Sequence, residues 1–131
     1  MANPYQNRWG DNYVGEGTTI GAYVEIGESV KIGNNCKIQS KAFIAPGTLI
    51  ENDVFIGPGV IVCNDKYPRA SGEWELSPVL IKNGASIGAG AVICAGVIIG
   101  EDAMIGCGAV VTKSVPAGET WVGNPARPAN S

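Results

Sequence analysis

The polar residues best suited to chemistry lie between Val62 and Ile81, in a stretch that carries Asn64, Asp65 and Arg69. The chain contains no histidine. An alcohol must lose its proton as it attacks, so a hydroxyl nucleophile normally depends on a general base such as histidine. An amine that titrates near about pH 8 is partly neutral at pH 7 and mainly needs to be positioned. The residues therefore allow amine chemistry, in which Asn64 accepts a hydrogen bond from the amine and Asp65 accepts its proton or orients it.

These side chains also have structural interpretations. Asn64 and Asp65 can open an Asx-type turn. Arg69 can bind a diphosphate, or it can form a salt bridge to Glu73 or Glu75. All of these alternatives are open at this point.

The aromatic residues and cysteines are similarly ambiguous. Tyr67 and Trp74 either anchor the stretch or offer surfaces on which a sugar or base stacks. Without histidine, neither a three-histidine metal site nor a Cys63–His dyad can form, and we expect no metal. The four cysteines lack C-x-x-C spacing, which is typical of small, reduced packing residues in a cytoplasmic protein. They are Cys36, Cys63, Cys94 and Cys107.

The elements that must position these residues follow from a six-residue repeat on both sides of the stretch. An aliphatic residue, Ile or Val, stands at positions 14, 20, 26, 32, 38, 44, 50, 56 and 62, and again at 81, 87, 93, 99, 105 and 111. A small or β-branched residue usually follows four places later, and glycine often follows directly. A period of six matches neither a helix nor a half-buried strand. Repeats this short must stack to share one core.

The interruption of this repeat divides the chain. We expect a single domain with an N-terminal cap over residues 1–13, coils over 14–62, a loop over 63–80, coils over 81–115 and a C-terminal cap over 116–131. Proline and polar residues after position 116 argue against another coil. Polar loops on a rigid scaffold are where function concentrates.

Composition narrows the possible partners. The 131 residues carry a net charge of −3 with a pI near 4.8, and no basic cluster offsets this, which argues against nucleic acid. Asn83 to Gly100 is free of charge, but it continues the repeat, so we expect no membrane span. The N-terminus lacks a signal-peptide layout, and we expect a cytoplasmic protein.

The repeat resembles that of the hexapeptide-repeat acetyltransferases. The loop segment Asn64-Asp-Lys-Tyr-Pro-Arg69 and the later Gly123-Asn-Pro-Ala-Arg127 are similar to the nucleotide-sugar N-acetyltransferases within that group. The usual threonine before the loop asparagine is replaced by Cys63. This resemblance implies an all-β fold, a left-handed parallel β-helix with one long extruded loop. It also implies a homotrimer with sites between neighbouring prisms.

The resemblance further implies which residues bind the substrates. Acetyl-CoA would be the acyl donor, and a nucleotide-linked amino sugar, often a 3-amino sugar, would be the acceptor. Catalytic roles are expected for Asn64 and Asp65, and cofactor contacts for Ala89, Cys107, Thr112, Lys113 and Arg127. Contacts with the acceptor are expected from Lys66, Tyr67, Arg69 and Trp74. Lys113 and Arg127 are otherwise simply exposed charges near the end of the chain.

Three functions are therefore compared. The first is an N-acetyltransferase for a nucleotide-linked amino sugar. The second is an acetyltransferase for another small amine or hydroxyl acceptor. The third is a non-catalytic solenoid that serves as a scaffold, which would have little use for the polar loop.

Overall fold

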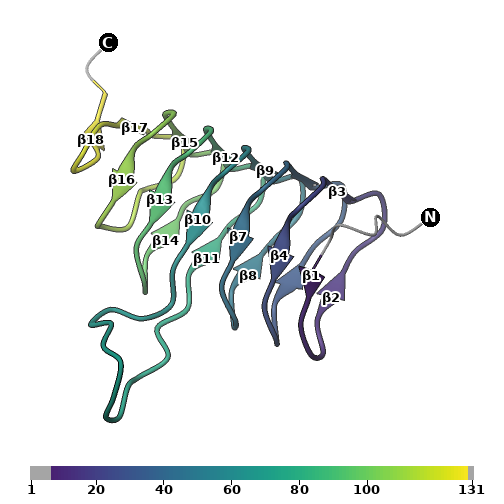
Figure 1. The fold of residues 1–131 in the computed structure, drawn as a ribbon. Coiled ribbons are helices and arrows are strands. Elements are labelled where there is room, and N and C mark those ends of the chain that lie inside the picture. The colour runs from purple at the N-terminus through teal and green to yellow at the C-terminus, as the bar shows by residue number, and fades with distance from the viewer. Residues whose placement is uncertain (1–6, 130–131) are drawn as a thin grey trace.

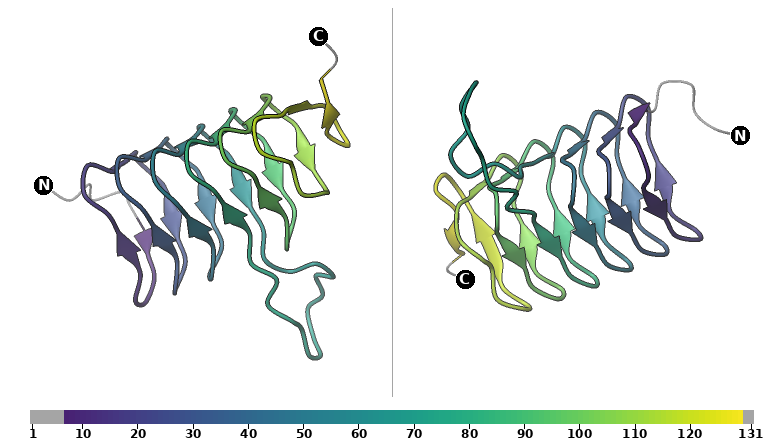
Figure 2. Two further views of the ribbon diagram at one scale, coloured as in Figure 1. Left: turned by 180° about the vertical axis from the view of Figure 1, so that it is seen from behind. Right: turned by 90° about the horizontal axis from the view of Figure 1, so that it is seen from below.

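The computed structural model describes residues 7–129, so residues 1–6 and 130–131 lie outside the described part. Residues 7–129 form short strands joined by turns, and this part of the chain contains no helix long and apolar enough to cross a membrane. The strands wind into a triangular prism with β1 near one end and β18 at the other (Figure 1). The predicted all-β, left-handed parallel β-helix with one long extruded loop is confirmed (Figure 2).

Successive strands belong in turn to three sheets, which form the three faces of the prism. Sheet A contains β1 (Asn7–Arg8), β4 (Glu25–Ile26), β7 (Phe43–Ile44), β10 (Ile61–Val62), β13 (Val92–Ile93) and β16 (Val110–Val111). Sheet B contains β2 (Tyr13–Val14), β5 (Lys31–Ile32), β8 (Leu49–Ile50), β11 (Leu80–Ile81) and β14 (Ile98–Ile99). Sheet C contains β3 (Thr19–Ile20), β6 (Lys37–Ile38), β9 (Phe55–Ile56), β12 (Ser86–Ile87), β15 (Met104–Ile105), β17 (Thr120–Val122) and β18 (Arg127–Pro128).

The core is a stack of the repeated aliphatic residues. Ile38 pairs with Ile20 on one side and Ile56 on the other, as the resemblance to the hexapeptide-repeat acetyltransferases implies. In a two-residue strand the side chains point to opposite faces, so the second residue enters the core while the first faces outward. Each buried isoleucine contributes about 1.5–3 kcal/mol, but only because neighbouring coils cover it.

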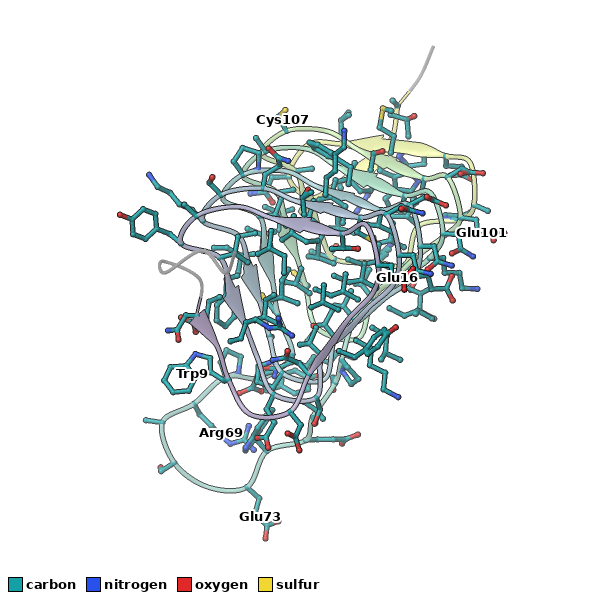
Figure 3. All side chains as sticks on the ribbon, turned by 90° about the vertical axis from the view of Figure 1, so that its right-hand side faces the viewer. Trp9, Glu16, Arg69, Glu73, Glu101 and Cys107 are labelled. Carbon is teal, nitrogen blue, oxygen red and sulfur yellow. The ribbon has the colours of Figure 1, made fainter. Side chains whose placement is uncertain are left out.

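Turns join the faces at three corners, which we name after the sheets they connect. Between strands, the A–B corner contains residues 27–30, 45–48, 94–97 and 112–114, together with the loop. The B–C corner contains residues 15–18, 33–36, 51–54, 82–85 and 100–103. The C–A corner contains residues 39–42, 57–60, 88–91 and 106–109. Figure 3 shows Cys107 at the C–A corner, Glu16 and Glu101 at the B–C corner, and Arg69 on the loop.

Close approach between coils explains the glycine that follows many inward residues. A Cβ added to Gly57 would lie 2.7 Å from the backbone nitrogen of Ala89 in the next coil. Backbone hydrogen bonds tie the same corner together, for example from Gly90 N to Pro58 O at 2.9 Å and from Gly108 N to Ala89 O at 2.8 Å. The C–A corner is therefore a continuous column of stacked turns.

Asparagine side chains brace the B–C corner. Asn34 Oδ1 accepts a hydrogen bond from Glu16 N at 2.9 Å, and Asn52 Oδ1 accepts one from Asn34 N at 2.8 Å. Asn83 Oδ1 accepts one from Asn52 N at 2.9 Å. The last of these bonds joins the coils before and after the loop, so the brace is continuous across the inserted segment.

The loop is an insertion into one corner and leaves the stack in register. Phe43 and Ile61 pair 18 positions apart, whereas Ile61 pairs with Val92, 31 positions further on. The loop therefore adds 13 residues to a single coil. It leaves and re-enters the prism at the A–B corner, between β10 and β11 (Figure 1).

The last coil extends past the expected boundary at residue 116, because Ile105 pairs with Trp121 in β17. Val115 forms a parallel bridge with Ile99. The buried indole of Trp121 takes an inward position that the repeat normally gives to an aliphatic residue, and its Nε1 donates to Glu119 Oε1 at 2.9 Å.

Residues 123–129 then turn back, and β18 pairs antiparallel with β17. Ala126 N donates a hydrogen bond to Val110 O at 2.8 Å, so this returning segment pairs with the edge of β16. At the other end β1 pairs with β4, so residues 7–13 already belong to the coils. The rest of the predicted N-terminal cap, residues 1–6, lies outside the described residues.

Candidate active site at the extruded loop

The neck of the loop is held closed by its own backbone. Asn64 O accepts a hydrogen bond from Ser77 N at 2.9 Å, and Asp65 forms an antiparallel bridge with Leu76. Ser77 O in turn accepts from Gly96 N at 2.9 Å, which fastens the neck to the following coil. The position of Asn64 is therefore set by the prism and not only by the loop.

The side chain of Asn64 is anchored to the preceding coil. Its Nδ2 donates to the carbonyl oxygen of Pro46 at 3.1 Å, and the residue is partly exposed. Because a carbonyl can only accept, this contact orients the amide with nitrogen towards Pro46. Oδ1 is then the acceptor at the other edge of the same amide.

Asp65 forms the turn that was one of its two interpretations. Its Oδ1 accepts a hydrogen bond from Tyr67 N at 3.2 Å, which is an Asx-type turn. The second carboxylate oxygen is not part of that turn. Asn64 does not form an equivalent turn, because its side chain reaches Pro46.

Charged and aromatic residues shape the tip of the loop. Arg69 Nη1 donates to Tyr67 O at 2.7 Å, so the guanidinium is bent back over the loop. Lys66 Nζ lies 5.8 Å from the centre of the Tyr67 ring, within cation–π range. Glu73 projects away from the prism (Figure 3).

A hollow of about 370 Å³ opens between these side chains, which we call the loop hollow. It is lined by Asp65, Lys66, Tyr67, Arg69, Glu75 and Ser77. The lining brings together three of the four predicted acceptor-binding residues and one of the predicted catalytic pair. Two cations and two carboxylates face one space, which suits a ligand that carries both phosphate and amine groups.

Trp74 is not part of that lining. It lies instead in a hollow of about 240 Å³ against the A–B corner, with Glu28, Ser29, Pro46, Gly47 and Leu76, which we call the corner hollow. Pro46, Gly47 and Glu28 were not identified from the sequence. The 18-residue period places Pro46 one coil before Asn64, so that spacing could have shown Pro46 to be its neighbour.

The predicted cofactor residues lie on more than one corner. Ala89 and Cys107 stack at the C–A corner, whereas Thr112 and Lys113 are exposed at the A–B corner two coils beyond the loop. Figure 3 shows Cys107 at a different corner from the loop. Sheet A lies between these corners, so one chain alone does not bring Ala89 and Cys107 to Asn64.

Arg127 lies beyond the last coil. It belongs to β18, is exposed, and donates from Nη1 to Ala126 O at 2.8 Å. Lys113 and Arg127 are thus both exposed cations in the C-terminal part of the prism.

Cys63 precedes Asn64 and is partly buried at the neck. Burial, and to a smaller extent the neighbouring Cys94, raise the pKa of the Cys63 thiol above its ordinary value. The thiol is therefore protonated at neutral pH, which does not suit a nucleophile. Within residues 7–129 no three His, Cys, Asp or Glu side chains group in a way that could hold a metal ion.

Comparison with solved structures gives close matches to the prism. WeeI from Acinetobacter baumannii AYE is 34% identical, with a TM-score of 0.82 over 96% of this chain and 56% of its own. A hexapeptide-repeat acetyltransferase from Vibrio cholerae O1 biovar eltor, complexed with acetyl coenzyme A, is 26% identical, with a TM-score of 0.82 over 91% of this chain and 70% of its own. This chain thus spans little more than half the length of WeeI.

A third structure shares the fold at lower identity. A mutant of AntD, an N-acyltransferase from Bacillus cereus in complex with dTDP and coenzyme A, is 20% identical, with a TM-score of 0.87 over 98% of this chain and 78% of its own. No curated protein sequence matches the chain. The family described as bacterial transferase hexapeptide (six repeats) matches residues 13–46 and 78–113, more than half of the chain. The chain therefore belongs to the bacterial hexapeptide transferase family.

Proposed function

We propose that this protein is an acetyl-CoA-dependent N-acetyltransferase that acts on the amine of a nucleotide-linked amino sugar. The observation that supports it best is the amide of Asn64, anchored on Pro46 O with Oδ1 oriented as an acceptor, in a chain without histidine. An amine N–H can donate to that oxygen, which aims the nitrogen lone pair at an acyl carbon. An alcohol would still need a general base, and the chain has no histidine to serve as one.

Acetyl-CoA would supply an activated acyl group as a thioester. Attack by the neutral amine forms the C–N bond and breaks the C–S bond, and the proton that leaves the nitrogen ends on the departing sulfur. Asn64 positions the amine throughout, which is a proximity effect. Asp65, with one oxygen committed to the Asx turn, retains one oxygen that can orient the amine.

The acceptor's charges fit the loop hollow. Lys66 and Arg69 are suited to the diphosphate of a nucleotide sugar. Thr112, Lys113 and Arg127 are suited to the adenosine end of CoA, and the stacked backbone at Ala89 and Cys107 to its pantetheine. The AntD structure, which shares this fold, contains both dTDP and coenzyme A.

A homotrimer would bring the separated parts together. Sheet A lies between the loop and the C–A corner, and its outward side chains include the exposed Phe43 and Ile61 with the partly exposed Val92 and Val110. Such apolar residues favour contact with another copy. In that arrangement the C–A corner of one prism lies beside the loop of the next.

Thiol release from acetyl-CoA tests the proposal. The protein is mixed with acetyl-CoA, a thiol reagent and a panel of UDP- and dTDP-linked amino sugars, with matched sugars that carry a hydroxyl in place of the amine. We expect release only with the amines. Release with hydroxyl sugars would favour a different acceptor class, and the absence of CoA binding would favour a non-catalytic scaffold.

Asn64→Ala sharpens the test. We expect turnover to fall at least about tenfold with the melting temperature unchanged, because a positioning contact is lost from a partly exposed site. Ser71→Ala, at the exposed tip of the same loop, should keep the full rate. Equal rates for the two variants would contradict the role of Asn64.

A further inference from the structure

The corner hollow is built differently from the loop hollow. One wall is the indole of Trp74, which is 53% exposed although it lies against the prism. Leu76 forms another wall, since a Cβ added to Gly47 would lie 3.3 Å from Leu76 Cδ2. Glu28 and Ser29 also line the hollow and supply a carboxylate and a hydroxyl.

This lining matches a ligand with one flat apolar face and a polar edge. A pyranose ring has C–H groups on its faces and hydroxyl or amino groups around its rim. The C–H face can cover an aromatic ring, while the rim donates hydrogen bonds to a carboxylate or hydroxyl. A protonated amine on the ring is also attracted by the indole face and by Glu28.

The corner hollow adjoins the reacting residue. Pro46 lines it, and the carbonyl of Pro46 is the hydrogen-bond partner of Asn64 Nδ2. A ring held there lies beside the amide that is proposed to receive the amine. The loop hollow contains Lys66 and Arg69 and shares no lining residue with the corner hollow.

We propose that the corner hollow is the subsite for the sugar ring of the acceptor, with the ring stacked on Trp74 and its rim bonded to Glu28 and Ser29. The inference rests on the proposed function, and it deepens it by dividing the acceptor between two hollows. The diphosphate occupies the loop hollow, where the cations are. Trp74 is thus a ring-binding residue, separate from the diphosphate-binding group of Lys66 and Arg69.

Trp9 provides a matched control for Trp74. It is 55% exposed, against 53% for Trp74, and it does not line the corner hollow. Calorimetric titration with free glucosamine and with UDP is carried out on the wild-type chain and on Trp74→Ala, Trp74→Phe and Trp9→Ala. We expect Trp74→Ala to weaken glucosamine about tenfold, Trp74→Phe to recover most of that loss, and Trp9→Ala to change nothing.

UDP distinguishes a sugar from a nucleobase on the indole. We expect its affinity to be the same in the wild type and in Trp74→Ala. A loss of UDP affinity without a loss of glucosamine affinity would overturn the inference, because the base would then be the stacked group. Equal glucosamine affinity in all chains, or no glucosamine binding at millimolar concentration to the wild type, would overturn it as well.

The thiol-release assay separates this inference from the proposed function. If no amino sugar releases thiol but glucosamine binding still depends on Trp74, the proposed reaction fails and the subsite stands. If thiol is released and Trp74→Ala leaves the KM for the acceptor unchanged, the reaction stands and the subsite is wrong. Glu28→Gln should raise the same KM without lowering kcat.

Discussion

Gly47 lies against Leu76 and Pro78 at the end of the loop, and Gly47→Ala tests whether this packing positions Asn64. Gly47 has φ of +85°, and a new Cβ would lie 3.3 Å from Leu76 Cδ2 and 3.6 Å from Pro78 Cβ. The left-handed conformation alone costs about 1–2 kcal/mol for a residue with a Cβ. The contacts add a displacement of Leu76 and, with it, of the neck.

Gly118→Ala separates the two effects. Gly118 has φ of +73°, and nothing lies within 4 Å of an added Cβ, so this variant carries the conformational cost alone. Gly118→Ala should lose about 1–2 kcal/mol of unfolding free energy, and Gly47→Ala should lose that amount plus the cost of the crowding at Leu76. Only Gly47→Ala should move Pro46 and Asn64, whose 3.1 Å hydrogen bond is worth about 1 kcal/mol.

Two quantities are measured for each variant: kcat/KM for thiol release, and the free energy of unfolding in urea. Loss of the Asn64 contact corresponds to a rate about fivefold lower for Gly47→Ala than for Gly118→Ala. Leu76→Ala combined with Gly47→Ala should recover part of the stability, because the crowding is removed. If the two glycine variants have the same rate, docking of Leu76 on Gly47 does not position Asn64.

Further predictions concern the core, a thiol and the cofactor. Ile87→Ala should cost about 2–5 kcal/mol of unfolding free energy, because Ile87 is fully buried. Ile98→Ala, at a 42% exposed position, should cost less than about 1 kcal/mol. Urea titration measures both losses, and equal losses would contradict the stacked core. Alkylation of Cys63, followed by mass spectrometry at neutral pH, should be slower than that of the exposed Cys107, since burial raises the pKa of Cys63; faster reaction at Cys63 would refute this. The raised pKa also means that the folded chain holds the thiol proton more tightly than the unfolded chain does. The unfolding free energy should therefore fall as pH rises past the ordinary thiol pKa of 9.0, and Cys63→Ala should remove that fall. Lys113→Ala should raise the KM for acetyl-CoA about two- to fivefold and leave the KM for acetyl-pantetheine unchanged. Lys31→Ala is the control at another exposed lysine. The same rise in KM for both donors would place Lys113 away from the phosphates.

A stacked fold was predictable because repeats of six residues must share one core. The triangular coil was implied by the resemblance to the hexapeptide-repeat acetyltransferases, and Ile20, Ile38 and Ile56 stack as that resemblance implies. The last coil was missed because Trp121 fills an inward position and the coil is shorter than 18 residues. A periodic pattern cannot show a repeat whose length and residue type both change.

The site was predictable only in part. The loop position follows from the break in the repeat, and Asp65, Lys66, Tyr67 and Arg69 do gather around one hollow. Their roles towards the substrate remain predictions. The anchoring of Asn64 on Pro46 and the placement of Trp74 were not predicted, because the direction in which an inserted loop folds depends on contacts such as that of Leu76 with Gly47.

The brace of asparagines along the B–C corner has a consequence for how such a protein can diverge. The bond from Asn52 N to Asn83 Oδ1 is 2.9 Å across the inserted coil, against 2.8 Å for the uninterrupted step from Asn34 N to Asn52 Oδ1. The extra residues therefore leave the opposite edge of the prism undisturbed. Segments of other lengths and chemistries can be exchanged at this one gap while the scaffold keeps its register, so the chemistry of the loop and the folding of the prism are free to evolve separately.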